Sequence, residues 1–230
     1  LTEALGFAPP LYCHLPLVVT PDGLPLSKRE AGSSIEELRN RGFLPEAVLN
    51  EAARLGWSPA DGFLTLEEMI GSFSLERLSK SPSVFAVERL KFYNKKAIER
   101  LDAPTLLGLL GLVVKKETER RYISSIEAVR HNAATLREVK ELISPLIGDA
   151  VYSKEAESLL KEPCSKKVLN EFLAALPDEA ELNEASYNRI IDKVKTSTGE
   201  KGRRLFLPLR CALTGTLEGA PLEKAASALG

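Results

Sequence analysis

The 230-residue sequence has few of the residues that build metal sites, disulfide frameworks or nucleophilic triads. Its three cysteines are odd in number and far apart, and no C-x-x-C pair occurs. This spacing supports neither a disulfide framework nor a zinc site, so we expect reduced thiols and predict no metal site. The two histidines, His14 and His131, stand in no H-E-x-x-H or triad context.

A long apolar run is also lacking. The longest, around Leu106 to Val114, is interrupted by Gly108 and Gly111 and falls far short of the roughly 18 residues that cross a bilayer. The N-terminus shows no basic segment followed by an apolar core, so no signal peptide is predicted. We therefore expect a cytoplasmic protein without a membrane partner.

Charge of either sign is not in excess, with 31 Lys and Arg against 32 Asp and Glu and a net charge of -1. Since 44% of the residues are hydrophobic, the composition is that of a globular protein and not of a disordered one. A net charge near zero is compatible with local basic patches. The only methionine is Met69 and the chain begins at Leu1, so we expect a fragment or a processed chain.

What is present is a helical pattern behind a short N-terminal β region. Leu15 to Thr20 reads as a strand, and Pro21-Asp22-Gly23 as a turn. Helix-start signals follow at Ser34 with Glu37, at Thr65 with Glu68 and at Asp102. The periodicity predicts helices near residues 34–41, 46–55, 87–101, 104–113, 119–131, 136–147, 154–161, 166–176, 184–194, 203–213 and 222–229. The predicted fold class is mainly α, a helical bundle or cage with a small β remnant at the N-terminus.

Two segments resemble the K-M-S-K-S signature of class I aminoacyl-tRNA synthetases: Leu26-Ser27-Lys28-Arg29 and Leu78-Ser79-Lys80-Ser81. In that chemistry a loop brings a lysine ammonium to the phosphates of ATP, where its charge stabilises the transition state. By residue identity alone, the second segment is closer to the signature. Context favours the first, because it follows a strand and a turn, whereas the second follows a helical stretch and precedes Pro82.

The wider sequence resembles the bacterial glutamyl-tRNA synthetases around and beyond their K-L-S-K-R loop. Between residues 104 and 187 the similarity is in helical character only. The matching segments are Leu5 to Phe7, Pro9-Pro10, His14 to Leu17, Asp22-Gly23, Leu26 to Arg29 with Gly32, Gly42 to Ala47, Leu49-Asn50, Leu55 to Ser58, Phe73 to Pro82, Val84-Phe85, Lys91 to Asn94, Lys201-Gly202, Leu205-Phe206, Pro208 to Arg210 and Ala212 to Gly215.

This resemblance implies a ligase that activates glutamate with ATP, with Mg as its companion ion, and transfers it to tRNA-Glu; whether tRNA-Gln is also a substrate stays open. Lys28 would be the catalytic cation, with Leu26, Ser27 and Arg29 completing the ATP-binding loop. Pro25 stands where the family usually has a lysine. The family's H-I-G-H signature and nucleotide-binding sheet are expected before Leu1. The chain alone is therefore expected to hold no cofactor stably and not to aminoacylate.

The family layout also implies a division of the chain and a monomeric state. Residues 1–103 would form the end of the catalytic region with stem-contact helices, and residues 104–152 and 153–230 two anticodon-binding helical subdomains. A rival hypothesis is a non-catalytic tRNA-binding or protein-scaffolding module derived from a synthetase, which Pro25 favours.

Two basic clusters are the candidates for tRNA contact. Each alone is typical of a solvated helix face, but the resemblance favours RNA for the first and leaves the second balanced. Trp57, Phe85 and Tyr93 are expected to pack in the core. The predicted contact residues are Arg89, Lys91, Lys95 and Lys96 in the first cluster and Lys201, Arg203, Arg204 and Arg210 in the second.

Overall fold

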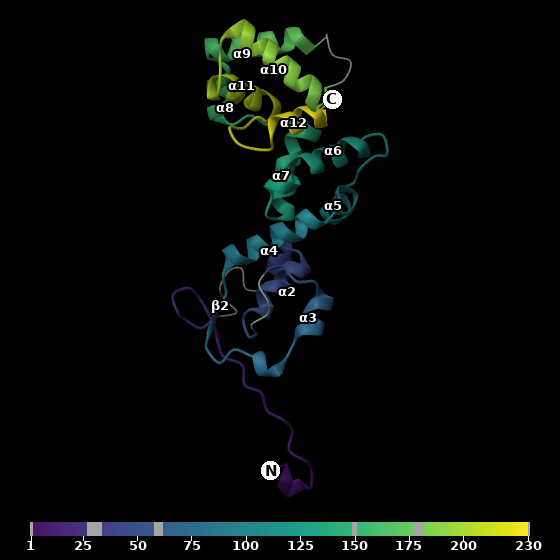
Figure 1. The fold of residues 1–230 in the computed structure, drawn as a ribbon, viewed down its shortest axis with the longest axis vertical. Helices are drawn as coiled ribbons and strands as arrows, with labels where there is room; N and C mark the ends of the chain where they lie inside the picture. Colours follow the sequence, from purple (N-terminus) through teal and green to yellow (C-terminus); the bar gives the residue numbers. More distant parts are fainter. Residues whose placement is uncertain (1, 27–33, 58–61, 149–150, 177–181, 230) are drawn as a thin grey trace. The chain divides into compact units, whose positions relative to one another are not determined.

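A computed structural model describes residues 2–26, 34–57, 62–148, 151–176 and 182–229 (Figure 1). The chain divides into two compact units, named here unit 1 (Leu1–Arg39 and Pro45–Tyr93) and unit 2 (Asn40–Leu44 and Asn94–Gly230). Helices make up most of the regular secondary structure in both units, which confirms the mainly α fold class. Among the described residues, no helix combines the length and the apolar character needed to traverse a membrane.

The β structure of unit 1 is a parallel pair of two-residue strands, β1 (Val18–Val19) and β2 (Ser83–Val84). The strand predicted over 15–20 is shorter than expected, because Pro16 and Pro21 bound it and a proline cannot donate to a ladder. The predicted turn is present: the N–H of Thr20 donates to the carbonyl of Leu24 at 2.8 Å, and Pro25 pairs with Val19 in an antiparallel bridge.

The helices of this part of the chain begin at the predicted signals. They are α1 (Ile35–Asn40), α2 (Pro45–Ala53), α3 (Leu66–Ser72) and the start of α4 (Val87–Arg100), with 3-10 turns η1 (Glu3–Leu5) and η2 (Leu75–Arg77). The Ser34 hydroxyl accepts the N–H of Glu37 at 3.1 Å. Thr65 and Glu68 form a reciprocal capping box, which fixes the start of α3.

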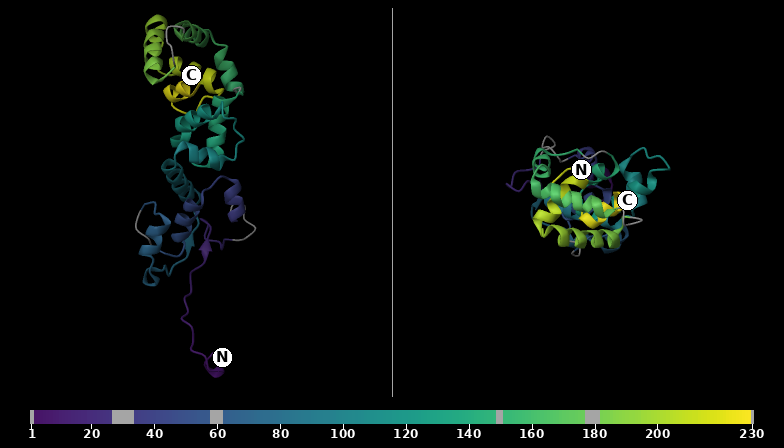
Figure 2. Two further views of the ribbon diagram at one scale, coloured as in Figure 1. Left: turned by 90° about the vertical axis from the view of Figure 1, so that its right-hand side faces the viewer. Right: turned by 90° about the horizontal axis from the view of Figure 1, so that it is seen from above.

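Unit 2 is a helical array with a continuous apolar core. Helices α8 to α12 gather into one group in both Figures 1 and 2. α9, α10, α11 and α12 share a core that includes Val168, Phe172, Ile190, Leu205 and Leu209. The elements are α5 (Ala103–Leu110), α6 (Glu119–Val129), η3 (Arg130–Asn132), α7 (Leu136–Ile147), α8 (Lys154–Leu160), α9 (Pro163–Ala175), α10 (Glu184–Thr198), α11 (Arg203–Thr214) and α12 (Leu222–Leu229).

Three helix ends differ from the sequence prediction by three residues or more. α5 stops at Leu110 rather than 113, because Gly111 adopts a left-handed conformation with φ 61°. α9 starts at Pro163 rather than 166, because a proline fits the first helical position, which needs no N–H. α10 runs past 194 to Thr198, where left-handed Gly199 ends it.

Residues 40–44 belong to unit 2 because buried Asn94 binds them there. The Asn94 amide oxygen accepts the N–H of Leu44 at 2.6 Å, and its nitrogen donates to the carbonyl of Ala134 at 2.6 Å. Gly42 has φ 85°, and a Cβ on it would lie 2.7 Å from the backbone nitrogen of Arg137. Only glycine allows this close approach without strain.

Candidate nucleic-acid interface

The two candidate phosphate loops differ in how the chain holds them. Leu26 is half-buried, and its N–H donates to the carbonyl of Val18 at 2.9 Å. Ser27, Lys28 and Arg29 lie outside the described residues. In the second segment, Ser79 donates its N–H to Gly56 at 3.0 Å, and Leu78 forms a bridge with Trp57. The second segment is therefore attached to the end of α2, whereas the first starts from β1.

Arg89, predicted to contact tRNA, forms an ion pair inside unit 1. Its Nε and Nη2 donate to both carboxylate oxygens of Glu51 at 2.7 Å, and Nη2 also donates to the carbonyl of Val84 at 2.9 Å. Glu51 is fully buried and also accepts the N–H of Ala86 at 3.1 Å. The hydrogen bond to Glu51 raises the pKa of Arg89 against the opposing effect of burial. These contacts link α2 to the start of α4.

Of the three lysines of α4, Lys96 is exposed, and Lys91 and Lys95 are half-buried, as Arg89 is. Lys91 lies 3.6 Å from Glu88, and Lys96 pairs with Glu99 at 3.0 Å. Both are surface pairs one helical turn apart, worth about 0.3–0.5 kcal/mol each. Such weak pairs exchange readily for a phosphate. Lys95 follows Lys91 by four residues and so lies on the same side of the helix.

Phe92 is an exposed aromatic that the sequence reasoning missed. Its side chain is half-exposed among these lysines, while its neighbour Tyr93 is buried. The signal was available: at 100° per residue, Phe92 lies opposite Ala97 and Leu90, which are buried. An aromatic between cations can stack on an unpaired base. We call Lys91, Phe92, Lys95 and Lys96 the α4 patch.

The second cluster concentrates at the start of α11. Lys201, Arg203 and Arg204 are exposed, and Gly202 is the N-cap residue, with no side chain capping the first turn. The first amide groups of a helix have no partner within the helix and carry a partial positive charge. Cations beside an open helix start make an arrangement suited to phosphate. We call Lys201, Arg203 and Arg204 the α11 patch.

Arg210 is separate from the α11 patch in its bonding. Its Nη1 donates to the carbonyl of Ala220 at 2.7 Å, which ties α11 to the loop before α12. Phe206, on the helix between Arg203 and Arg210, is 37% exposed. The three residues follow one another at spacings of three and four and share a face of α11.

Two of the three aromatic residues expected in the core are buried. Trp57 and Tyr93 are buried, and Phe85 is half-buried. Trp57 packs edge-on against Phe73, with ring centroids 5.6 Å apart.

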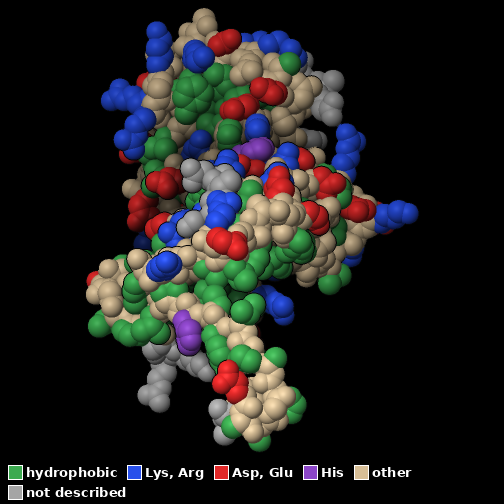
Figure 3. Space-filling view, turned by 60° about the horizontal axis from the view of Figure 1, so that its bottom comes forward, with side chains coloured by type: hydrophobic (Ala, Val, Ile, Leu, Met, Phe, Trp, Pro, Cys, Tyr) green, Lys and Arg blue, Asp and Glu red, His purple; other side chains and the backbone are tan. Residues whose placement is uncertain are grey.

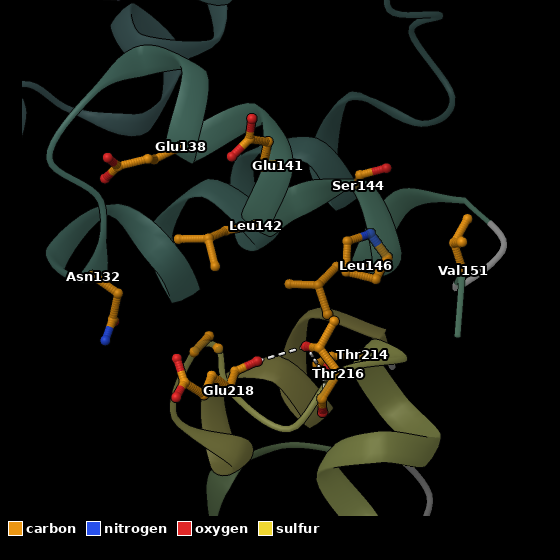
Figure 4. A pocket seen from close by; sticks show the side chains of 13 residues that line it. Asn132, Glu138, Glu141, Leu142, Ser144, Leu146, Val151, Thr214, Thr216 and Glu218 are labelled. Atoms are coloured by element: carbon orange, nitrogen blue, oxygen red, sulfur yellow. Dashed lines mark hydrogen bonds between the residues drawn. The ribbon is translucent and has the colours of Figure 1, made fainter. Parts of the chain in front are cut away.

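Unit 2 also has a cavity of about 670 Å³ whose charged lining residues are all acidic (Figure 4). Glu138 and Glu141 reach it from α7, and Glu218 from the loop after α11. Glu138 accepts the N–H of Ala134 at 2.6 Å, and Glu141 pairs with Arg137 at 3.0 Å. Carboxylates repel phosphate, so this face of unit 2 is unsuited to the RNA backbone. Across the described ranges, no group of three or more His, Cys, Asp or Glu could hold a metal ion.

Two family models match the chain in series. One described as "tRNA synthetases class I (E and Q), catalytic domain" matches residues 1–92, and one described as "Anticodon binding domain" matches residues 84–230. The second match includes the α4 and α11 patches.

Curated relatives match along the whole chain. The glutamate–tRNA ligase of Heliobacterium modesticaldum is 32% identical over 242 residues, covering 99% of this chain and 49% of the relative. Glutamate–tRNA ligase 2 of Syntrophus aciditrophicus is 35% identical over 240 residues, covering 100% and 49%. The chain thus spans about half the length of the curated relatives it matches. A crystal structure of a glutamate tRNA ligase from Elizabethkingia meningosepticum has the same fold, with a TM-score of 0.79 at 23% identity, covering 100% of this chain and 50% of that one.

Proposed function

Because this chain belongs to the anticodon-binding domain family and is homologous over its full length to glutamate–tRNA ligases, we propose that it is the tRNA-binding part of such a ligase. The parent enzyme would activate glutamate with ATP and transfer it to tRNA-Glu. The observation that supports this most strongly is the order of the two family matches, a catalytic-domain segment followed by an anticodon-binding segment.

The tRNA contacts are proposed to come from the α4 and α11 patches. The α11 patch has three exposed cations, and the α4 patch has one exposed and two half-buried cations; each has an aromatic ring close by in the sequence, Phe206 or Phe92. Phosphate contacts by the cations would supply affinity, and the rings would stack on bases that leave the helix stack. Arg89 and Arg210 would act mainly by holding the structure, since both guanidinium groups bind within the protein.

The ATP-binding loop and the division of the chain are further parts of the proposal. Lys28 would neutralise the triphosphate of Mg-bound ATP, with Leu26, Ser27 and Arg29 shaping the loop. Residues 1–103 would complete the catalytic region and reach the tRNA stem, and residues 104–152 and 153–230 would bind the anticodon arm. Such an enzyme would act in the cytoplasm, where tRNA is charged.

Binding of fluorescent tRNA-Glu to the 230-residue chain tests the α11 patch. The double variant Lys201→Glu/Arg203→Glu should weaken binding by roughly tenfold or more, since it replaces two phosphate contacts by two repulsions. The double control Lys116→Glu/Lys140→Glu makes the same charge change at two exposed positions of unit 2 outside the patch. Equal loss in both variants would mean that net charge and not the patch governs binding.

A matched experiment tests the α4 patch. Lys95→Glu/Lys96→Glu should weaken binding by a similar factor, and Phe92→Ala should weaken it by about the 1–3 kcal/mol of one stacked base. Retained affinity in both variants would remove α4 from the interface. Repeating the titration with tRNA-Gln measures whether the chain discriminates between the two tRNAs.

Glutamate-dependent exchange between pyrophosphate and ATP tests whether this chain alone can form glutamyl-adenylate. The 230-residue chain on its own contains no H-I-G-H segment, and we expect no glutamyl-adenylate from it. Formation of the adenylate would contradict this assignment. The rival scaffolding module is favoured by Pro25, which stiffens the loop where the family usually has a lysine. That rival predicts no tRNA binding above that of an unrelated protein of equal charge.

A further inference from the structure

The second half of α4, Asn94 to Arg100, is held at two places by one short segment, Arg130 to Ala134. All of these residues belong to unit 2. At the first place, the side-chain nitrogen of the buried Asn94 donates to the carbonyl of Ala134 at 2.6 Å. At the second, Nη1 of Arg130 donates to the carbonyl of Leu101, the residue after α4, at 2.7 Å. We call the segment Arg130 to Ala134 the α4 clamp.

Arg130 supplies a donor that the end of α4 lacks. The last carbonyls of an α-helix have no N–H partner within the helix, and the helix dipole favours a cation beside them. Besides bonding Leu101, the same Nη1 lies 3.5 Å from the carbonyl of Glu99. Nε of Arg130 lies 2.9 Å from a carboxylate oxygen of Glu127, one turn earlier on α6, and the arginine side chain is 21% exposed. The guanidinium group is therefore largely buried and engaged on two sides.

Two lysines of the α4 patch, Lys95 and Lys96, lie between the two places that the clamp holds. They directly follow Asn94 and precede the last turn of the helix. In an α-helix each carbonyl accepts the N–H four residues on, so the carbonyls of both lysines are bonded by the last two residues of α4, Glu99 and Arg100. Helix ends fray when nothing holds them. By closing the last turn, the clamp fixes the backbone from which the lysines extend.

The position of each cation matters because charges of both signs share this surface. On the face of the molecule drawn in Figure 3, acidic and basic side chains are interspersed over the helices. Lys96 itself is paired with Glu99 at 3.0 Å. Since such surface pairs are weak and attraction falls with distance, a phosphate selects the cation that the helix places closest to it. A small shift of the last turn of α4 is therefore expected to reduce the affinity for RNA.

We propose that Arg130 is a positioning residue for tRNA binding, which acts through Lys95 and Lys96 and makes no phosphate contact of its own. This inference rests on the proposed function of the α4 patch and extends it to a residue of another element, η3. Arg130 is a cation close to the patch, but its guanidinium group bonds the end of α4 and faces Glu127.

A double-mutant cycle with fluorescent tRNA-Glu and the 230-residue chain tests the proposal. Arg130→Met removes the donor at the end of α4 and should weaken binding by roughly threefold or more, a coupling typical of residues that act together. In the Lys95→Ala/Lys96→Ala background the same change should have no further effect, because no lysine is left to position. In the Lys201→Glu/Arg203→Glu background it should keep its full effect, because the α11 patch lies elsewhere.

Three further measurements separate positioning from direct contact. In the Lys95→Ala/Lys96→Ala background, Arg130→Met should leave the salt dependence of binding unchanged, whereas a lost phosphate contact would lower the slope by about one. Arg130→Lys keeps a charged donor and should restore most of the affinity. The matched control Arg137→Met removes a guanidinium group that pairs with Glu141 on the surface of α7, and should weaken binding less than Arg130→Met does.

Hydrogen exchange without tRNA tests the clamp itself. Arg130→Met should speed the exchange of the amides of residues 97–101 and leave α10 protected, because α10 belongs to the separate core of α9 to α12. If α10 also lost protection, Arg130→Gln, which keeps a shorter neutral donor, would replace Arg130→Met in the cycle, and its loss of affinity should likewise vanish in the Lys95→Ala/Lys96→Ala background.

Two contrary results are distinguishable. If Lys95→Ala/Lys96→Ala leaves the affinity for tRNA-Glu unchanged, the α4 patch is not part of the interface, and the proposal falls together with that part of the proposed function. If Lys95→Ala/Lys96→Ala weakens binding but Arg130→Met weakens it equally with and without the lysines, or not at all, the α4 patch stands and the positioning role of Arg130 is overturned.

Discussion

The two units of this chain differ in how completely each covers its own apolar surface. In unit 2, helices α9 to α12 enclose a core of fully buried side chains such as Ile190, Leu205 and Leu209. Unit 1 has 15 of the 21 large hydrophobic side chains recorded as exposed among the described residues, although it is the shorter unit. Unit 2 therefore buries most of its large apolar side chains in its own core, whereas unit 1 leaves many of its own exposed.

The two units also differ in how they use their cationic side chains. Arg203 and Arg204 of the α11 patch lie in the first turn of α11, and Lys201 directly precedes that helix; all three are exposed. In unit 1 the cation Arg89 is used to satisfy a buried carboxylate, Glu51. Unit 2 thus presents the exposed cations of the α11 patch to a polyanion, whereas unit 1 uses Arg89 to hold its own elements and exposes more apolar surface.

The largest expected effect is in the core of unit 2. Leu205→Ala removes a fully buried side chain and should lower the free energy of unfolding by roughly 2–5 kcal/mol. The control Leu173→Ala, on α9 of the same unit, changes a side chain that is 61% exposed and should cost under about 0.5 kcal/mol. Urea unfolding followed by circular dichroism measures both. Equal losses would contradict the view of unit 2 as a self-contained core.

A slightly smaller effect is expected where unit 1 buries a charge. Arg89→Met leaves the Glu51 carboxylate buried without its cation and should destabilise unit 1 by about 3 kcal/mol. The double variant Glu51→Gln/Arg89→Met should recover part of that loss, because it removes the uncompensated charge. Hydrogen exchange resolves the units: α2 should lose protection and α10 should keep it. A loss of protection in both units would contradict the view that this ion pair stabilises unit 1 alone.

The next effect tests which unit residues 40–44 belong to. Gly42→Ala places a methyl group 2.7 Å from the Arg137 nitrogen at a positive φ, so we expect a loss of about 1–3 kcal/mol in unit 2. Gly23→Ala has a similar φ but open space around its Cβ position, and should cost about 1 kcal/mol. Similar losses in the two variants would mean that the packing of Gly42 on α7 is unimportant.

The smallest effect is a pH dependence at the start of α5. Hydrogen bonds from the side chain and the backbone N–H of Thr105 lower the pKa of Asp102. A carboxyl whose pKa is lower in the folded state stabilises the fold above its unfolded pKa, about 3.9, and this contribution is lost as the pH falls through the folded pKa. Asp102→Asn keeps the cap but does not titrate. The urea midpoint of the variant should therefore fall less between about pH 5 and pH 2.5 than that of the wild type.

Helix positions were predictable from the sequence where a local signal sets them. Thr65 with Glu68 marks the start of α3, and the apolar spacing of Leu90, Tyr93 and Ile98 gives the buried face of α4. The errors in helix bounds arose at prolines and glycines, because either residue can interrupt a helix or mark one of its ends. Pro163 starts α9 three residues before the predicted position, and the left-handed Gly111 ends α5 earlier than hydrophobicity suggests.

The candidate site was less predictable, because a charged residue in a sequence does not reveal its partner. Arg89 belongs to the same basic run as Lys95, yet its partner Glu51 lies 38 residues away and was not visible from spacing. The exposed ring of Phe92 could have been found from helical periodicity. The open start of α11 at Gly202 could not, since it depends on which side chains fail to cap it.

The salt dependence of tRNA-Glu binding tests most directly the claim that unit 2 binds RNA through positioned cations. For the wild-type chain, the logarithm of affinity should fall linearly with the logarithm of salt concentration, and Lys201→Glu/Arg203→Glu/Arg204→Glu should reduce the slope by about 2–3, close to one per lost phosphate contact. Lys140→Glu should leave the slope unchanged. A slope that is flat, or that is the same in the wild type and the triple variant, would contradict the account.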